Sequence, residues 1–335
     1  MTAKRTTEGR RGMMIFAFSF CLFALALLFG PQLKSSLVFA LDDITVSFQG
    51  PGILNVPVAI ALQRGFFKEQ NLDVKLILTR SDVDRAALVT GNIDFTLRGA
   101  STVLSAARGL PVRMLFVTTV KPFWALVVRP EVNSVKELKN KVMSVAGIAG
   151  GQHVATRVIL KKYGLDPDKD VVFKVVNAGS RLPGMMSGSM DAGLMEYGEA
   201  FRAKKSGFKI LLNAAEHYSI LGGAIGATTK KLHEQPDQVK RFLRANVKGL
   251  RYMQDNRSAA LETMMNWLKV DREMAEGVYD LAINNFAKDG TIDEATLQGV
   301  INDQLTEVKI KDVPLSQVTD FAPLYQILRE AAFSR

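Results

Sequence analysis

Apolar and polar positions in the N-terminal third of the chain follow the order strand, helix, strand. ITVSF (44–48) is an apolar strand, NVPVAIALQR (55–64) carries apolar residues at helical spacing, and LDVKLIL (72–78) has a strand pattern. Gly65 follows the helical segment, at the position where a left-handed residue commonly ends a helix. A unit of this kind predicts a parallel sheet with helices covering its faces.

The pattern continues as two sets of strands and helices. The first set comprises helices at 83–90 and 102–108 and strands at 92–97, 111–119 and 124–129; the second comprises helices at 135–141 and 151–164 and strands at 142–147, 165–176 and around Asp191. We expect Ser101 to cap the helix at 102–108. The phrase SGSMDAG (187–193) echoes TGNIDF (90–95), and this internal echo supports two lobes of like design.

The C-terminal part of the chain is predicted to return to the first lobe and then become helical. The glycine-rich apolar segment 222–229 predicts a returning strand. Helices are expected at 236–255, 258–268, 271–287 and 293–304. No segment between these elements is long enough to indicate an independent linker.

Residues 1–40 are typical of a secretory signal peptide. A basic head ending at Arg11 precedes a charge-free apolar run from Met13 to Phe29, and Val38 and Ala40 fit a cleavage site. The run is near the lower length limit for spanning a bilayer, so an uncleaved membrane anchor is the alternative. We expect export and cleavage after Ala40.

Composition excludes several classes of chemistry. The single cysteine, Cys21, lies in the apolar run, so the chain after Ala40 has no thiol for a disulfide, a nucleophile or a thiolate metal site. Three histidines argue against a histidine-built metal site. The net charge of +10 is not gathered into the basic and aromatic stripe that nucleic-acid binding requires. We therefore expect no metal, no cofactor and no nucleic-acid partner.

Several phrases resemble a known family. They are ALVTGNIDF (87–95), the turn at Glu137 to Lys141, the turn at Gly164 to Val171, and the phrase at Ser187 to Ala192. Together with the opening segment, they resemble the substrate-binding proteins of ABC importers, in the branch that binds nitrate, taurine, aliphatic sulfonates and thiamine-pyrimidine precursors. The resemblance covers about residues 44–230 and is weaker over the helical C-terminal third.

The resemblance implies an α/β fold of the periplasmic-binding-protein type. Each of two lobes would be a mixed, mainly parallel sheet flanked by helices, with the helical C-terminal region packing on lobe 1. The expected boundaries are a signal peptide at 1–40, lobe 1 at 41–128, lobe 2 at 129–223, and the return to lobe 1 at 224–335. The chain crossings near 124–130 and 222–228 would form a hinge.

Ligands of open α/β sheets bind beyond the carboxyl ends of the strands, near helix N-termini that favour anions. The loops at those ends supply the candidate ligand-binding residues: Gly50, Gly52, Asn55, Arg80, Ser81, Arg98, Gly99, Ser101, Trp124, Gly150, Gly151, Gln152, Asn177 and Glu196. The candidate site has no catalytic residue, because spacing indicates neither a pair of acids nor a Ser–His–Asp set.

Three of the candidate side chains, and His153 outside the candidate set, have a specific expected role or alternative. Arg98 directly follows a predicted strand and is expected to hold a negative group of the ligand; the alternative is a structural salt bridge. Relatives often carry an acidic residue at the position of Glu196, so the resemblance implies contact with a ligand amine; the alternative is that Glu196 caps a helix starting near Gly198. Trp124 either stacks on the ligand or packs at the hinge, and His153 is expected to be exposed.

These features predict the extracytoplasmic solute-binding component of an ABC importer. It would bind a small anionic solute, such as a sulfonate, nitrate or taurine, in a cleft between lobes, and would be a monomer. Its partners would be a membrane permease and a separate ATPase, because the chain has no P-loop.

We expect the chain not to be an enzyme. The resemblance includes a desulfinase with a cysteine nucleophile and a fungal pyrimidine-precursor synthase with a cysteine-rich motif, and both features are absent here. The alternatives are an enzyme of pyrimidine-precursor or sulfur metabolism on the same fold, and a membrane-anchored sensor ectodomain.

Overall fold

The computed structural model describes residues 40–148 and 151–333. Residues 41–335 form one compact unit, and the account below concerns this unit. The predicted signal peptide therefore lies outside the described residues except for Ala40. No helix among the described residues combines the length and apolarity needed to span a membrane.

The first of two sheets contains five strands in the order β2–β1–β3–β10–β4. Their bounds are β1 Asp42–Phe48, β2 Leu72–Leu78, β3 Phe95–Thr96, β4 Val112–Thr119 and β10 Gly223–Thr228. β1 is parallel to β2 and β3, whereas β10 runs antiparallel to β3 and β4. The predicted return of the chain to the first sheet after residue 222 is thus observed as β10.

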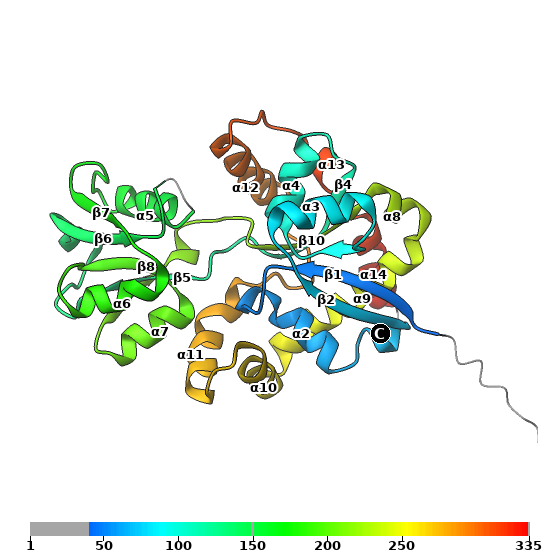
Figure 1. Cartoon of the computed structure of the whole chain (residues 1–335), viewed down its shortest axis with the longest axis horizontal. Helices are drawn as coiled ribbons and strands as arrows, with labels where there is room; N and C mark the ends of the chain where they lie inside the picture. Colours follow the sequence, from blue (N-terminus) through cyan, green and yellow to red (C-terminus); the bar gives the residue numbers. More distant parts are fainter. Residues whose placement is uncertain (1–39, 149–150, 334–335) are drawn as a thin grey trace, which may run out of the picture. The chain divides into compact units, whose positions relative to one another are not determined.

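The second sheet repeats this design in the order β7–β6–β8–β5–β9. Its strands are β5 Trp124–Val128, β6 Lys141–Val145, β7 Val171–Val175, β8 Ala192–Glu196 and β9 Lys209–Asn213. β6 is parallel to β7 and β8, and β5 is antiparallel to β8 and β9. The domain boundary at residue 128 stays a prediction; β5, which ends there, pairs within the second sheet (Figure 1).

Helices cover both faces of each sheet, as the alternating pattern predicts. Up to the last strand they are η1 Ile53–Asn55, α2 Val56–Gln63, η2 Lys68–Gln70, α3 Ser81–Thr90, α4 Gly99–Ala107, η3 Val135–Leu138, α5 Gly151–Lys162, α6 Ala178–Met186, α7 Tyr197–Lys205 and η4 Ala214–Glu216. In the second sheet, α5 lies on one face and α6 and α7 lie on the other (Figure 1). Accordingly, Ala125 and Val127 face one core cluster, while Leu126 and Val128 face another.

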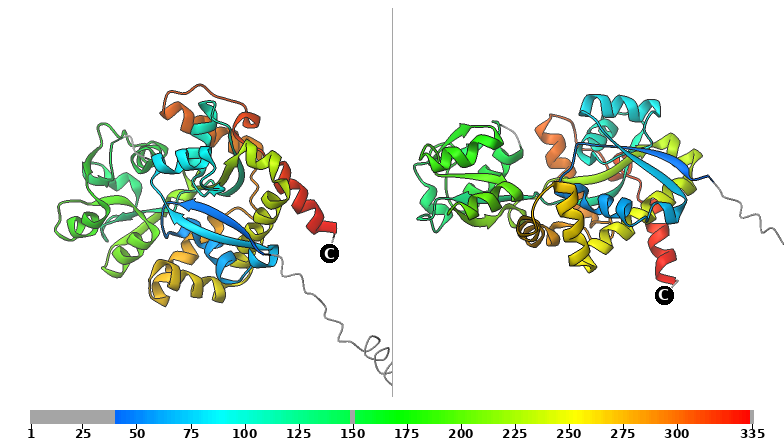
Figure 2. Two further views of the ribbon diagram at one scale, coloured as in Figure 1. Left: turned by 45° about the vertical axis from the view of Figure 1, so that its right-hand side comes forward. Right: turned by 60° about the horizontal axis from the view of Figure 1, so that its bottom comes forward.

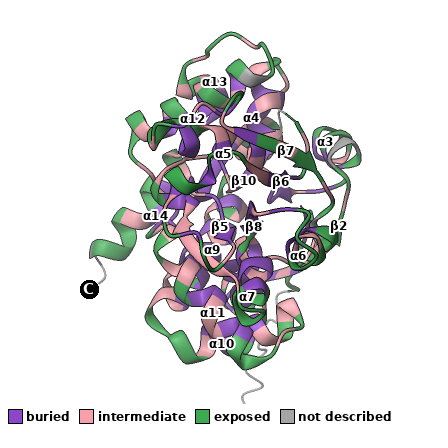
Figure 3. Ribbon diagram, turned by 90° about the vertical axis from the view of Figure 1, so that its left-hand side faces the viewer, coloured by how far each residue is buried: buried purple, intermediate pink, exposed green. Residues whose placement is uncertain are grey.

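The α/β class and the two mixed sheets are confirmed, and burial follows them: the interiors of β5 and β8 are buried, whereas the outer helix faces are exposed (Figure 3). Two local predictions are wrong. Ser101 does not cap a helix, because α4 begins at Gly99 with Arg98 at its N-cap. The strand predicted at 92–97 is only Phe95–Thr96, because the backbone N–H of Thr45 bonds the Asp94 carboxylate at 2.9 Å before the ladder begins.

The echo between TGNIDF and SGSMDAG has a physical basis. In each lobe, a glycine with positive φ ends a helix, Gly91 at 78° and Gly188 at 83°. An aspartate then accepts a backbone N–H of the adjacent parallel strand through its carboxylate: Asp94 from Thr45 and Asp191 from Val142, both at 2.9 Å. One sequence phrase therefore starts a strand in the same way in both sheets.

The C-terminal third is helical, as predicted. It consists of α8 Thr229–Glu234, α9 Pro236–Asp255, α10 Arg257–Leu268, α11 Arg272–Ala282, η5 Ile283–Asn285, α12 Glu294–Glu307, α13 Leu315–Val318 and α14 Ala322–Phe333. α9 packs on α2, and α12 packs on α4, on the side of the first sheet. This region therefore packs on the first sheet, as expected, and α11 in addition packs against α7 of the second sheet (Figures 1 and 2).

Candidate functional site

The candidate site is built from two neighbouring cavities. The first compartment, of about 390 Å³, is lined by Gln49, Gly50, Pro51, Gly52, Ile53, Leu54, Lys121, Pro122, Phe123, Trp124, Glu196, Ile220, Leu221 and Gly222. The second compartment, of about 320 Å³, is lined by Trp124, Ala146, Gly147, Gly151, Gln152, Arg181 and Glu196. Trp124 and Glu196 belong to both compartments.

Strand register brings these two shared residues together. Trp124 is the first residue of β5 and Glu196 is the last residue of β8, and they face each other as a cross-strand pair. The indole N–H of Trp124 donates a hydrogen bond to the Glu196 carboxylate. An aromatic face and an acidic acceptor therefore stand side by side in the wall common to both compartments.

The carboxyl of Glu196 has a perturbed pKa. The side chain still reaches solvent within the cleft, but the surrounding walls replace part of its hydration. This burial raises the pKa, and it outweighs the opposing effects of Arg181 and of the Trp124 hydrogen bond. A cationic or hydrogen-bond-donating ligand group would supply the stabilisation that the carboxylate lacks.

Arg181 lies beneath the second compartment, and its side chain is only 3% exposed. It donates to Glu199 Oε2 at 3.0 Å and to Gln152 Oε1 at 2.9 Å. Its Nε has no hydrogen-bond partner among the described residues. Burial raises the pKa of Glu199 in spite of the adjacent guanidinium. The loss of hydration therefore disfavours the charged carboxylate more than its contact with Arg181 stabilises it.

The N-terminus of α5 closes the second compartment from another side. A Cβ added to Gly151 would lie 3.2 Å from Trp124 Cη2 and 3.4 Å from Ile220 Cδ1. Glycine thus lets the first turn of α5 approach the Trp124 ring. In the first compartment the charged lining group besides Glu196 is Lys121, whose Nζ contacts Ser219 Oγ at 3.3 Å.

The structure brings together six of the residues predicted from sequence. Gly50, Gly52, Trp124, Gly151, Gln152 and Glu196 line the two compartments. Asn55 lies just behind them: it is buried, and its side chain donates to the Gly50 carbonyl at 3.0 Å. Gly150 lies outside the described residues.

The other predicted residues that the structure describes lie outside the lining of the two compartments. Arg80 is exposed at the N-cap of α3, Ser81 begins that helix, Gly99 and Ser101 lie in the first turn of α4, and Asn177 is the N-cap of α6. Gly99 packs against β10, where an added Cβ would lie 2.4 Å from Ala224 Cβ. These positions satisfy the strand-end rule without contributing to either compartment's lining.

Arg98 is engaged by its own lobe. Its guanidinium donates to the Thr79 carbonyl, and its Nε lies 3.9 Å from Asp84 Oδ1. Asp84 is 1% exposed and also accepts from the hydroxyls of Ser47 and Thr96. Contact between Arg98 and a ligand anion stays a prediction.

Two features were missed or misjudged from sequence. Arg181 lies in the segment 177–181 that follows a predicted strand, but it was not named as a ligand-binding residue, because an arginine within a helix has no local pattern that distinguishes a buried from an exposed position. His153 was expected to be exposed but is buried, with its ring centroid 4.6 Å from that of Phe173, and burial lowers its pKa. Within residues 40–148 and 151–333, no three or more His, Cys, Asp or Glu side chains are arranged to hold a metal ion.

The two mixed sheets flanked by helices, with a cleft at the β5 and β8 ends, are the architecture of periplasmic binding proteins. The putative sulfonate ABC transporter protein SsuA of Methylobacillus flagellatus KT superposes with a TM-score of 0.72 at 14% identity, over 88% of this chain and 96% of that chain. At this identity the likeness shows the shared fold.

The chain belongs to the NMT1/THI5 like family. The model of this family matches residues 55–260, which is more than half of the chain. A curated relative from Candida albicans (strain WO-1), named 4-amino-5-hydroxymethyl-2-methylpyrimidine phosphate synthase, is 25% identical over 272 residues, which cover 70% of this chain and 79% of the relative. The synthase THI13 of Saccharomyces cerevisiae is 26% identical over 150 residues, and the match spans 43% of each protein.

These relatives correct one expectation. The chain was expected not to be an enzyme, yet the curated relatives that it matches at about 25% identity are named as synthases. That expectation rested on absent cysteine motifs and on spacing that indicates neither a pair of acids nor a Ser–His–Asp set. Such an absence excludes one set of side chains but does not exclude catalysis by other groups on the same fold.

Proposed function

We propose that this protein binds a small solute carrying an aromatic ring and an amino group, of the aminopyrimidine kind, in the cleft around Trp124 and Glu196. The single observation that carries the proposal is the cross-strand pair of these two residues, which is common to both compartments. A planar ring can stack on the indole, and its amino group can donate to the carboxylate.

The charge distribution supports an amine-bearing solute over a simple anion. Arg181 is already paired with Glu199, and Lys121 contacts Ser219, whereas Glu196 accepts from a neutral donor, Trp124. The cavity volumes of about 390 and 320 Å³ suit a molecule of one ring. Sulfonates, nitrate and taurine, the solutes expected from sequence, remain in the test panel.

The role proposed for the binding event is delivery to an ABC importer. The structurally similar SsuA of Methylobacillus flagellatus KT is described as a periplasmic sulfonate-binding protein of an ABC transporter. Residues 1–40 of the present chain have the pattern of a signal peptide. We propose that the protein is exported to the periplasm or cell envelope, that it closes about the crossings that join the two sheets, and that as a monomer it transfers the solute to a permease with its separate ATPase.

Mass spectrometry of the envelope fraction tests the proposed export and should find an N-terminus at Leu41. Retention of Met1 or Thr2 in membranes would contradict cleavage.

Calorimetric titration of the purified protein tests the binding proposal. The panel contains 4-amino-5-hydroxymethyl-2-methylpyrimidine, taurine, an alkanesulfonate and nitrate, and we expect the pyrimidine to bind most tightly. Glu196→Gln and Trp124→Ala should each weaken it about tenfold to a hundredfold, whereas Glu131→Gln, an exposed carboxyl outside the cleft, should leave it unchanged. Tightest binding of nitrate or a sulfonate, with no effect of Glu196→Gln, would overturn the proposal.

The names of the curated relatives favour a second candidate function, chemistry on a pyrimidine precursor. To distinguish catalysis from binding alone, the protein is incubated with the panel and each compound is followed by mass spectrometry. Recovery of every compound unchanged from the protein that binds it would favour solute capture. Conversion that depends on Glu196 would favour the enzyme.

A further inference from the structure

The second compartment presents hydrogen-bond donors, in contrast to the acceptor at Glu196. Gln152 and Arg181 line it, and α5, a helix of 12 residues, begins there at Gly151. The first N–H groups of a helix have no acceptor within the helix and favour negative charge. Arg181 adds an independent observation, since it is 3% exposed and its Nε has no hydrogen-bond partner among the described residues.

Arg181 also determines how the Gln152 amide is oriented. A guanidinium can only donate, so the atom that it contacts at 2.9 Å must be the amide oxygen of Gln152. This contact leaves the amide N–H₂ group of Gln152 for other acceptors. The other arm of the guanidinium holds Glu199 at 3.0 Å, which fixes the side chain and offsets its charge.

We infer that Arg181 is a specificity-determining residue that acts by positioning Gln152. Together they make the second compartment a site for an anionic group, such as a phosphate, sulfonate or carboxylate, on the same solute whose amine contacts Glu196. The inference rests on the proposed function and adds that the solute is amphoteric. Because Glu199 offsets the charge of Arg181, selection depends on directed donors more than on net positive charge.

A matched pair of ligands tests this inference. They are 4-amino-5-hydroxymethyl-2-methylpyrimidine and its phosphate ester, which differ only in the anionic group. We expect the wild-type protein to bind the ester at least about tenfold more tightly than the alcohol. The measured quantity is the ratio of the two dissociation constants, because a general loss of structure weakens both ligands together.

Substitutions at Gln152 leave Arg181 in place. In Gln152→Glu, one carboxylate oxygen can keep the contact with Arg181 while the other turns an acceptor toward the ligand, so the preference for the ester should vanish or invert. Gln152→Leu removes the donor and should reduce the ratio about tenfold. Arg181→Lys should reduce this ratio to a similar extent, because lysine lacks the planar guanidinium that contacts Gln152 and Glu199 at once. Thermal melting checks that each variant is folded.

Gln63→Glu is the matched control, since Gln63 is exposed at the end of α2 and lines neither compartment. It adds the same charge to the protein and should keep the wild-type ratio. An unchanged ratio in Gln152→Glu, or equal binding of alcohol and ester by the wild-type protein, would overturn this inference while the proposed function stands. Binding of neither compound would overturn the proposed function and this inference with it.

Discussion

At the residue scale, Glu196 has opposite consequences for stability and for binding. Its carboxylate is partly stripped of water by the cleft walls, which raises its pKa. An acid whose pKa is raised by folding makes the folded state less stable once the pH exceeds its ordinary range, because the unfolded chain ionises more readily. A ligand amine that pairs with the carboxylate would remove this penalty. Such local costs are common at binding sites.

Glu196→Gln should therefore raise the melting temperature of the unliganded protein while it weakens ligand binding. The sign follows from the raised pKa: the gain should be absent at about pH 4 and should grow as the pH rises through and above the range in which glutamate ionises. Thermal melts of the wild-type protein and the variant between pH 4 and about pH 8 measure it, with Glu131→Gln as control. A variant that melts earlier at neutral pH would show that Glu196 stabilises the unliganded fold.

Arg98→Ala separates the two roles considered for that side chain. Since Arg98 approaches the buried Asp84 and donates to the Thr79 carbonyl, its loss should destabilise the unliganded protein by about 1–3 kcal/mol. Urea denaturation without ligand measures this effect. If stability were unchanged and ligand affinity fell tenfold or more, the contact with a ligand anion would be supported instead.

Sequence predicted part of the candidate site because strand ends are visible in the pattern of apolar residues. Trp124, Gln152 and Glu196 were found through this rule. The same rule also selected Arg80 and Asn177, since it identifies one edge of each sheet and not the loops that meet across the cleft. Arg181 lies in the segment 177–181 that the rule also marked, but its role could not be predicted, because its contacts with Gln152 and Glu199 join three elements that only tertiary structure brings together.

At the scale of elements, the repeated aspartate phrase explains why the presence of two lobes was easier to predict than the length of their strands. The phrase recurs in sequence, so both lobes could be recognised. The Asp94 and Asp191 carboxylates accept N–H groups that a backbone carbonyl would otherwise accept, and this contact shortens or offsets the start of the strand. Strand length therefore depends on a neighbouring strand that is far away in the sequence. Helix positions were predicted within a few residues because their apolar spacing and glycine ends are local.

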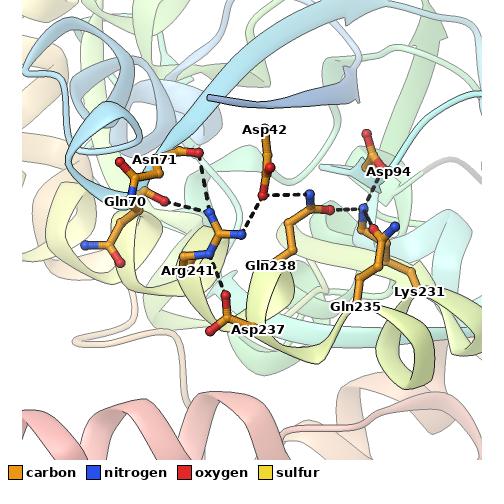
Figure 4. Close-up of polar contacts among 9 residues, drawn as sticks. All are labelled: Asp42, Gln70, Asn71, Asp94, Lys231, Gln235, Asp237, Gln238 and Arg241. Atoms are coloured by element: carbon orange, nitrogen blue, oxygen red, sulfur yellow. Dashed lines mark hydrogen bonds and ion pairs between the residues drawn. The ribbon is translucent and has the colours of Figure 1, made fainter. Parts of the chain in front are cut away.

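A polar network fastens the start of β1 to α9 (Figure 4). Arg241 donates to Asp42 at 2.5 Å, to Asp237 at 2.7 Å and to the Gln70 carbonyl at 2.9 Å. The hydrogen bond from Arg241 lowers the pKa of Asp42. One side chain thus joins the strand, the turn before β2 and the helix that covers them.

Arg241→Ala should lower the free energy of unfolding by about 1–2 kcal/mol, since it removes several charge-assisted hydrogen bonds from a side chain that is 21% exposed. Because the pKa of Asp42 is lowered by folding, its contribution is present above about pH 4 and is lost as the pH falls below that range. The difference between variant and wild type should shrink accordingly in urea titrations toward acid pH. Arg272→Ala, which breaks an exposed pair with Glu276, should cost at most about 0.5 kcal/mol; equal effects of the two changes would contradict a special role for Arg241.

At the scale of the described unit, the two sheets are joined by more than the chain crossings. β5 follows β4 of the first sheet but pairs in the second, and β10 follows β9 of the second sheet but pairs in the first. A hydrophobic cluster extends from Phe48 and Phe242 on one side to Met195 and Ala200 on the other. α11 contributes to this continuity, and its packing on α7 could not be predicted because both helices are amphipathic with no marked partner.

The contact between α11 and α7 depends on one glycine. A Cβ at Gly277 would lie 2.0 Å from Phe201 Cε2, whereas a Cβ at Gly299, in the interior of α12, would meet no heavy atom within 4 Å. Gly277→Ala should therefore destabilise the protein by about 1–3 kcal/mol through overpacking. Gly299→Ala should stabilise it by about 0.4–1 kcal/mol, because alanine reduces the freedom of the unfolded chain and favours the helix.

Urea denaturation of both variants checks this opposition of sign. Adding Phe201→Ala to Gly277→Ala should recover part of the loss, because it removes the ring that the new methyl group strikes, and the coupling in this double-mutant cycle reports the contact directly. The cost of Gly277→Ala should also exceed the helix-propensity gain of about 1 kcal/mol that alanine brings to an unobstructed helix position. If both glycine variants were equally stabilised, α11 and α7 would not be packed as closely as the structure describes, and the first and second sheets would be joined mainly through their crossings.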